Sequence, residues 1–256
     1  MSQQLRIAHL YPEQMNIYGD RGNIITLTQR CLWRGIEVDV VPISIGATVD
    51  WSTYDIVFFG GGQDSGQALI ANDFVHHHGP ALRETIDDGL VMLAICGGYQ
   101  LLGHYFVTHT GEQLPGVGAF DIHTVGEDVR MIGNVVIEVD GIRAGPGDNR
   151  LHNTPSLRLV GFENHSGQTF LGKGVRPFGR VLVGHGNNGE DGTEGAIYRN
   201  AFGCYLHGSL LPKNPQFADH LITLALERRY DQANLAMLDD MFELHAQRTM
   251  INRLLR

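Results

Sequence analysis

Short apolar runs alternate with longer mixed stretches along the first half of the chain, and this alternation predicts strands followed by helices. The predicted strands are residues 5–10, 36–43, 55–59 and 90–95. The predicted helices are residues 23–33, residues 66–89 with a break or new start at Gly79-Pro80, and a helix from about residue 98. Because a strand such as "VMLAI" is apolar throughout, we expect an α/β fold with a mostly parallel central sheet and flanking helices on both faces.

The second half of the chain has a different pattern, in which β-branched and aromatic runs are separated by Gly and Asn turns. Strands are predicted at residues 134–140, 159–167, 179–184 and 193–208, and helices at residues 214–229 and about 233–251. Residues 140–157 have the composition of a loop. Since neither a repeat nor an interdomain linker is evident, we expect residues 1–256 to form a single domain.

Composition narrows the range of partners. The formal net charge is −9, so the phosphate backbone of a nucleic acid is a poor partner. No apolar stretch is long enough to span a bilayer, and the first residues lack the charged and apolar regions of a secretion signal. The three cysteines are far apart, which favours reduced thiols over a disulfide framework. We therefore expect a cytoplasmic protein that does not bind nucleic acid and does not insert into a membrane.

The segment "VMLAICGGYQLLG" places a cysteine where an apolar strand turns into a helix. Ligands of open parallel sheets bind beyond the carboxyl ends of the strands. Cys96 is at such an end, Gly97 and Gly98 permit a sharp turn, and the helix N-terminus favours a thiolate. The Gly97 amide is then placed to donate to an oxyanion. We interpret Cys96 as a nucleophile, whereas Cys31 and Cys204 lie in apolar segments typical of the core.

A cysteine nucleophile needs a base, and the chain has thirteen histidines. His207 ends an apolar strand, so it is able to meet Cys96 across the sheet. His165 and His185 are its rivals, and the pattern ranks His207 only slightly ahead. The consecutive histidines 76–78 are interpreted as a solvated helix end, because consecutive spacing is poor for binding a metal ion from one helix. We expect no metal site.

Three motifs carry a resemblance to a known family. The segments "ICGGYQLLG", "GFENHSG" and "YLHG" resemble motifs of class I glutamine amidotransferases of the CobB/CobQ-like branch. The segments "MNIYGDRGN", "GNNGEDGTEGA" and "YLHGSLLPKNP" are similar to those of the GatD-type glutaminase subunits of lipid II isoglutaminyl synthases. This resemblance covers essentially the whole chain and implies the flavodoxin-like fold of class I amidotransferases.

The resemblance implies a glutaminase in which Cys96 is the nucleophile and His207 the base. Thiolate attack on the side-chain amide of glutamine gives a tetrahedral oxyanion, then a γ-glutamyl thioester and ammonia. His207 would protonate the leaving amine and later activate water.

Four further residues are implied in binding glutamine or its oxyanion: Arg130, Gln100, Gly62 and Gly97. Arg130 matches a family arginine that holds glutamine, and the glycines at 61–62 offer a second oxyanion donor. Without the resemblance, Arg130 is an ordinary exposed arginine and the glycines are equally well a strand-to-helix turn.

The resemblance also implies a second chain. A Mur-ligase-like synthetase subunit of the MurT type would use ATP and Mg²⁺ to amidate the α-carboxyl of D-glutamate in lipid II, the peptidoglycan precursor. In this chain the segment "GQTFLGKG" nearly matches the sequence pattern of a phosphate-binding loop. Gly174 occupies the position that requires Ser or Thr, so a turn is favoured instead. We therefore expect no cofactor in this chain. Tyr18 and Arg21 mark either a docking segment for the synthetase or a wall of the glutamine pocket.

Two points stay open at this level. Many class I amidotransferases carry a carboxylate two residues after the catalytic histidine, where this chain has Ser209, so an acid from elsewhere or a dyad is implied. The acceptor is also open, because a CobB/CobQ-like subunit for another acid, such as a corrinoid, is an alternative. A non-catalytic interaction module on the same scaffold is the remaining alternative, and it predicts an unreactive Cys96.

Overall fold

The computed structural model describes residues 3–142 and 156–256, so most of the predicted loop 140–157 lies outside the described residues. Its first sheet has six strands in the order β11-β12-β4-β3-β1-β2. These strands are β1 (Gln4–Leu10), β2 (Glu37–Ile43), β3 (Ile56–Phe59), β4 (Val91–Ile95), β11 (Ala196–Tyr198) and β12 (Ala201–Cys204). All neighbours are parallel except the edge pair β11–β12. The mostly parallel sheet is therefore confirmed, and β3 and β4 are buried along their whole length.

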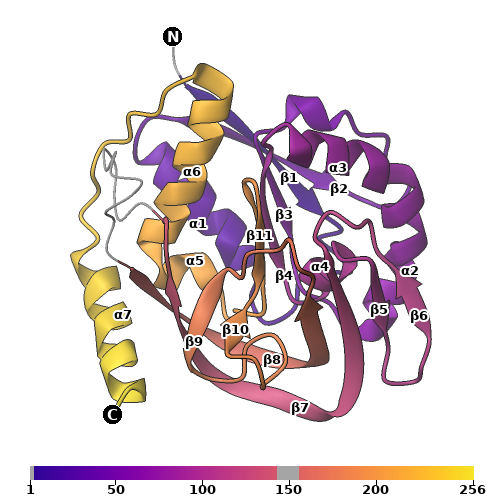
Figure 1. Ribbon diagram of the computed structural model, residues 1–256. Coiled ribbons are helices and arrows are strands. Elements are labelled where there is room, and N and C mark those ends of the chain that lie inside the picture. The colour runs from indigo at the N-terminus through magenta and orange to yellow at the C-terminus, as the bar shows by residue number, and fades with distance from the viewer. Residues whose placement is uncertain (1–2, 143–155) are drawn as a thin grey trace.

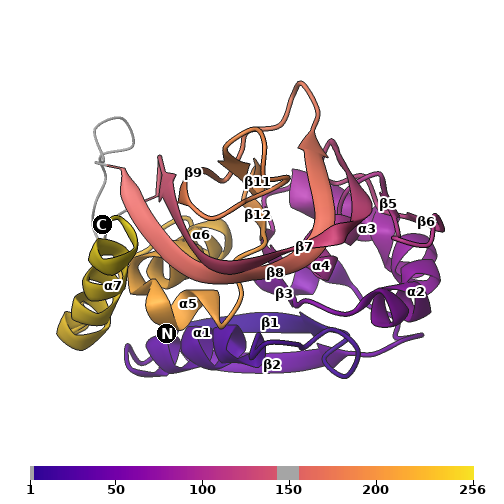
Figure 2. The ribbon, with the colours of Figure 1, turned by 90° about the horizontal axis from the view of Figure 1, so that it is seen from below.

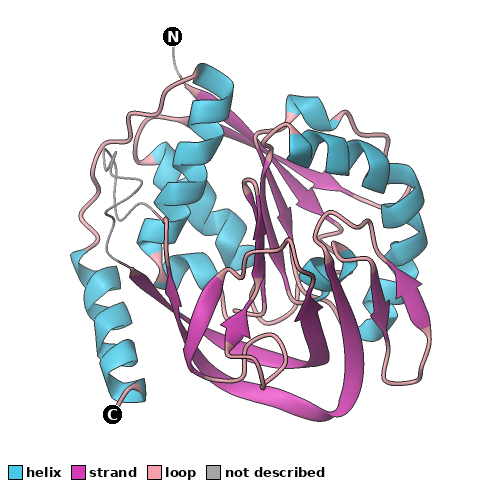
Figure 3. Cartoon of the chain, in the orientation of Figure 1, coloured by secondary structure: helices cyan, strands magenta, loops and turns pink. Residues whose placement is uncertain are grey.

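Helices cover both faces of this sheet, with α1, α5 and α6 on one side and α2 and α3 on the other (Figure 1; Figure 3). The helices are α1 (Arg21–Leu32), α2 (Asp64–Asp73), α3 (Gly79–Asp87), α4 (Gly97–Leu101), α5 (Leu210–Lys213), α6 (Pro215–Tyr230) and α7 (Met241–Leu254). A 3-10 turn, η1 (Trp51–Thr53), precedes β3, and a π-helical turn, η2 (Phe74–His78), joins α2 to α3. The new start predicted at Gly79-Pro80 is thus a change from π to α geometry, with proline in the first turn of α3.

The second sheet runs in the order β10-β9-β7-β5-β6, with β8 paired to β7. Its strands are β5 (Tyr105–Val107), β6 (Gln113–Pro115), β7 (Ile122–Val139), β8 (Leu157–Leu171), β9 (Gly179–Val183) and β10 (Thr193–Glu194). The pair β7–β8 forms one long curved ribbon that extends from near α7 to β5 and β6 (Figure 2). Both strands are longer than the predicted 134–140 and 159–167, because their pairing continues past a register shift between Gly126 and Met131.

Two sequence-based predictions are wrong in detail. The segment 193–208 is not one strand but β10, β11 and β12, because Gly195 and Arg199 both take positive φ values, 62° and 53°, and turn the chain. The last helix starts at Met241 rather than near residue 233. The reason is the Arg30 guanidinium, which binds Asp219 of α6 at 2.7 Å and Asp240 at 2.6 Å and so fixes the chain just before α7.

Buried side chains from both sheets form one main apolar core, to which residues of β1, β3, β4, α1, α3 and α6 contribute. His78 belongs to this core rather than to a solvated helix end, because its ring packs against Trp51 and Tyr11. Within the described residues, no helix combines the length and the apolar character needed to cross a membrane.

Candidate active site

Cys96 lies in the sharp turn between β4 and α4, and the backbone strain falls on the cysteine itself. Its φ of 49° and ψ of −107° lie outside the regions that residues with a Cβ atom prefer, whereas the sequence pointed to the following glycines as the turn formers. Two hydrogen bonds hold it there: the Cys96 amide donates to the Cys204 carbonyl at 2.8 Å, and the Gln100 amide donates to the Cys96 carbonyl at 2.9 Å. The helix that follows is only five residues long, so its dipole is weak. Positive charge to stabilise a thiolate must therefore come mostly from neighbouring side chains.

His207 is the histidine that the fold brings to Cys96. It follows β12, the strand next to β4, and its backbone exchanges two hydrogen bonds with Phe162 of β8. The ring is fully buried, and its Nε2 atom has no hydrogen-bond partner among the described residues. A Cβ atom on Gly61 would lie 2.6 Å from His207 Cε1 and 3.3 Å from Cys96 Cβ, so glycine is required where these side chains meet.

Asp20 is the third member of this cluster, and sequence reasoning missed it. Its Oδ1 lies 3.2 Å from His207 Nδ1, and its Oδ2 accepts a hydrogen bond of 2.7 Å from the Gly61 amide. Asp20 and His207 are both fully buried. The acid therefore comes from the "MNIYGDRGN" segment after β1 instead of the position two residues after the histidine. Ser209, which holds that position, donates from Oγ to the Gly19 carbonyl and so ties down the loop that carries Asp20.

Cys96 and Asp20 both favour the protonated form of His207. Burial by itself would lower the pKa of His207, but the neighbouring Cys96 and the Asp20 carboxylate outweigh burial and raise that pKa. The raised pKa favours the protonated form of the imidazole, which lies between Cys96 and Asp20. A protonated Nε2 facing a thiolate is the arrangement that nucleophilic attack followed by protonation of a leaving amine requires.

The oxyanion donors can be assigned more narrowly than the sequence allowed. The Gly61 amide is already bound to Asp20, so it is not free for a ligand. Gly62 lines the pocket at Cys96, and its amide makes no hydrogen bond with any residue that the structure describes. The Gly97 amide opens α4 and is likewise free, as expected of the first N–H groups of a helix. These two amides are the candidate oxyanion donors.

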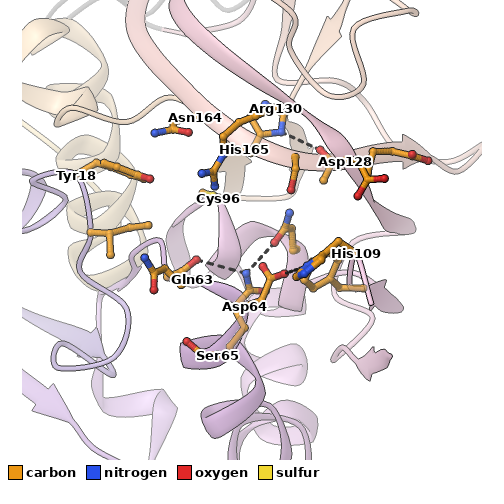
Figure 4. A pocket seen from close by; sticks show the side chains of 18 residues that line it. Tyr18, Gln63, Asp64, Ser65, Cys96, His109, Asp128, Arg130, Asn164 and His165 are labelled. Atoms are coloured by element: carbon orange, nitrogen blue, oxygen red, sulfur yellow. Dashed lines mark hydrogen bonds and ion pairs between the residues drawn. The ribbon is translucent and has the colours of Figure 1, made fainter. Parts of the chain in front are cut away.

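Cys96 opens into a pocket of about 520 Å³, which is lined by strands of the second sheet and by the segments that follow β1, β3 and β4. Figure 4 shows Arg130, Asn164 and His165 above Cys96 and Gln63, Asp64 and Ser65 below it. The predicted site residues Gln100, Gly62 and Arg130 all lie in its wall. Arg130 belongs to the register shift of β7, which also turns the acidic residues Glu127 and Asp128 toward the pocket.

Gln100 anchors the floor of the pocket through a chain of buried hydrogen bonds. Its Oε1 accepts from Gln67 Nε2 at 3.1 Å, and its Nε2 donates to the Tyr205 hydroxyl at 3.1 Å. The hydroxyl groups of Tyr205 and Thr169 lie 2.6 Å apart and continue the chain into β8. Because both ends of its carboxamide are engaged, Gln100 is better suited to fixing the pocket than to changing partners with a substrate.

Neither of the other two histidines considered as the base, His165 and His185, has the position and charge of His207. His185 is exposed, and its backbone amide is bound to Glu163. His165 lines the pocket, but its ring stacks on Tyr205 with centroids 3.6 Å apart, and Nδ1 lies 2.8 Å from the Gly167 carbonyl. Burial lowers the pKa of His165 to about 3, so it stays neutral. No cluster of His, Cys, Asp and Glu side chains suited to a metal ion occurs in residues 3–142 and 156–256.

The three thiols should differ sharply in reactivity. Cys31 and Cys204 are fully buried, and burial raises the pKa of Cys31 to about 12 and that of Cys204 well above its ordinary value. A diazo-ketone analogue of glutamine is therefore expected to label Cys96 and to spare the other two. Peptide mapping after labelling checks this, and label mainly on Cys31 or Cys204 would refute the assignment.

Glu194 of β10 makes stability depend on pH. Burial raises its pKa from 4.5 to about 8, although the Tyr205 amide donates to its Oε1. Between these two values the folded chain holds a proton that the unfolded chain has lost, so stability should fall as pH rises from about 5 to about 8. Glu194→Gln should flatten this dependence, because Oε2 has no partner among the described residues. Thermal unfolding of both proteins across this range gives the comparison, and parallel curves would contradict the prediction.

Comparisons with known proteins identify a family and relatives for this chain. The model of the CobB/CobQ-like glutamine amidotransferase domain matches residues 6–215. The GatD subunit of the glutamine-hydrolysing lipid II isoglutaminyl synthase of Streptococcus pneumoniae is 41% identical over 90% of this chain and 83% of its own length. The corresponding subunit from Staphylococcus aureus is 39% identical over 98% of this chain and 96% of its own length.

Solved structures bear on the fold alone. A chain in the structure of PurLQS from Thermotoga maritima superposes with a TM-score of 0.56 at 16% identity, covering 89% of this chain and 99% of that one. The fold expected from the sequence motifs is thereby confirmed. A family match across most of the chain, together with two relatives near 40% identity over nearly their full length, shows that the chain belongs to the CobB/CobQ-like glutamine amidotransferase family.

Proposed function

We propose that this chain is the glutamine-hydrolysing subunit of a lipid II isoglutaminyl synthase. The observation that carries the proposal is the buried cluster of Cys96, His207 and Asp20 at the floor of a pocket of about 520 Å³. The names of the two GatD relatives, which align along almost the whole chain, support the choice of reaction.

The geometry supports a two-step hydrolysis. The Cys96 thiolate attacks the Cδ carbon of the substrate glutamine, and the oxyanion accepts hydrogen bonds from the amides of Gly62 and Gly97. The His207 imidazolium gives its Nε2 proton to the leaving nitrogen, which departs as ammonia and leaves a γ-glutamyl thioester. Neutral His207 then takes a proton from water as the water attacks the thioester, and glutamate is released. Asp20 stabilises the imidazolium and holds the ring in place in both steps.

The wall of the pocket matches the two charges of the glutamine backbone. Arg130 is suited to bind the α-carboxylate, since guanidinium groups pair well with carboxylates. Asp64, Glu127 and Asp128 line the same pocket and supply negative charge for the α-ammonium group. Arg130 and Asp128 both lie above Cys96 in Figure 4, so a glutamine backbone bound there would direct its side-chain amide toward the sulfur.

The ammonia must be consumed by a second chain. At neutral pH free ammonia is mostly ammonium, which is not a nucleophile, so direct transfer to a synthetase site is needed. The partner we propose is a Mur-ligase-like subunit of the MurT type that uses ATP and Mg²⁺ to activate the α-carboxyl of D-glutamate in lipid II. This chain would hold no cofactor of its own, and the pair would work as a heterodimer in the cytoplasm, where peptidoglycan precursors are made and unpaired thiols such as these stay reduced.

The test is transfer of labelled nitrogen in the co-purified complex. Glutamine with heavy nitrogen in its side-chain amide, ATP, Mg²⁺ and lipid II are supplied, and the product is analysed by mass spectrometry. We expect the label in the new α-amide of D-isoglutamine. Amidation by the purified chain alone, or failure of any ligase to co-purify, would contradict the two-subunit proposal. Amidation of a corrinoid acid in place of lipid II would favour the alternative acceptor.

A further inference from the structure

Gln67, on the first turns of α2, carries a buried hydrogen-bond acceptor without a partner. The side chain is 2% exposed and lines the pocket that contains Cys96. Its Oε1 atom makes no hydrogen bond to any residue that the structure describes. A buried acceptor left unpaired lowers stability, so such an atom in a binding pocket is a place where a ligand can donate.

The orientation of the Gln67 carboxamide follows from its neighbours. Nε2 lies 3.1 Å from Gln100 Oε1 and 3.5 Å from the Gly62 carbonyl, and both of these atoms are acceptors. Gln100 continues this chain, because its own Nε2 donates to the Tyr205 hydroxyl. The Gly62 carbonyl can only accept, so reversing the Gln67 amide would place two oxygens against each other at that contact. The free atom is therefore the oxygen.

This oxygen belongs to a carboxamide that packs against both candidate oxyanion donors. The Gly62 carbonyl accepts from it, and a Cβ atom on Gly97 would lie 2.8 Å from Gln67 Nε2 and 2.9 Å from its Cδ. The free acceptor thus belongs to a side chain that contacts both glycines whose amides are free donors. A primary carboxamide has the opposite pattern, an acceptor oxygen and an N–H donor on one carbon.

We propose that Gln67 is a specificity-determining residue whose Oε1 accepts an N–H of the substrate's side-chain amide, while the amides of Gly62 and Gly97 bind its carbonyl oxygen. The inference rests on the proposed glutaminase function. Gln67 selects for the amide because a γ-carboxylate, as in the product glutamate, presents an oxygen to Oε1 where glutamine presents a donor. The same mismatch helps to release the product.

The test compares two substrates that share one acyl group. Glutamine and glutamate γ-methyl ester both acylate Cys96, but the leaving group of the ester has no N–H. In Gln67→Met we expect kcat/KM for glutamine to fall by about tenfold to a hundredfold, the range for leaving a buried polar group unpaired. Hydrolysis of the ester should change by less than about threefold, a difference smaller than one hydrogen bond is worth.

Gln216→Met is the matched control, because Gln216 of α6 also has an unpartnered Oε1 but does not line this pocket. It should leave both substrates unaffected. A parallel loss of both activities in Gln67→Met would show that Gln67 only supports the pocket, and an unchanged ratio at full activity would also overturn the inference. If the wild-type chain with its partner hydrolyses neither substrate, the proposed function itself fails, and that result is distinct from either of these.

Discussion

Replacing Cys96 by alanine is expected to lower glutamine hydrolysis by at least about four orders of magnitude, because removal of a covalent nucleophile from a catalytic unit leaves only binding and oxyanion stabilisation. The fold should survive, since the Cys96 backbone is held by hydrogen bonds to Cys204 and Gln100 that do not involve the thiol. Alanine must still adopt the positive φ, so thermal unfolding should be measured beside activity.

The same variant separates ammonia production from ammonia use. In the complex with the synthetase, Cys96→Ala should lose glutamine-dependent amidation but keep amidation driven by a high concentration of ammonium at mildly alkaline pH. Cys31→Ala serves as the control, because that thiol is buried in α1 and does not line the pocket. Full glutamine-dependent activity in Cys96→Ala, or loss of ammonium-dependent activity as well, would be inconsistent with this assignment.

Replacing Asp20 by asparagine is expected to reduce kcat by about 10²–10⁴-fold, comparable to changes of the orienting acid in other nucleophile–histidine–acid triads. The asparagine oxygen can still accept from the Gly61 amide, but its NH₂ group would face His207 Nδ1 and favour the wrong tautomer. Loss of the carboxylate also removes one of the two charges that raise the pKa of His207. The pH at which the base loses its proton should therefore move downward.

Steady-state kinetics over a range of pH, for wild type and Asp20→Asn, gives both quantities. Asp39→Asn is a suitable control, because that carboxylate is half exposed and pairs with Arg6 on the surface. Wild-type kcat in Asp20→Asn would mean that Cys96 and His207 act as a dyad. An unshifted pH profile combined with a large loss of kcat would assign Asp20 to positioning without an electrostatic contribution.

The parallel sheet and the sharp turn that carries Cys96 could be predicted because their signals are local. A run such as "VMLAI" followed by "CGG" specifies a buried strand and a tight turn within a few residues. Cys96 and His207 come together because β4 and β12 are neighbouring parallel strands that end at the same edge. The argument from strand ends therefore predicts the meeting of these two side chains, which the structure shows.

The features that the sequence did not predict have a common cause, because each of them depends on contacts between residues far apart in the chain. Asp20 is separated from His207 by most of the chain, and no local pattern marks it as a buried acid, since "GDRG" resembles a surface turn. The free Gly62 amide and the engaged Gly61 amide are likewise indistinguishable in "GGGQD". The start of α7 depends on the contact between Arg30 and Asp240, which the composition of residues 231–240 does not reveal.

Residues in the register shift of β7 were also beyond local prediction. Arg130 is exposed and resembles any surface arginine, and only the pairing of β7 with β8 brings it over Cys96. The prediction that Arg130 binds glutamine rested on the family resemblance, and the sequence did not predict that Glu127 and Asp128 line the same pocket. A bulge of this kind has no strong sequence signature, because its geometry is set by the partner strand.

The most direct test of the central claim is detection of the covalent intermediate. The complex is mixed with glutamine labelled in its carbon chain, quenched with acid during turnover, and digested for mass spectrometry. The triad of Cys96, His207 and Asp20 predicts a γ-glutamyl thioester on the peptide that contains Cys96, carrying the carbon label but not the amide nitrogen. Turnover of glutamine without any adduct on that peptide, or an adduct on Cys31 or Cys204 instead, would contradict it.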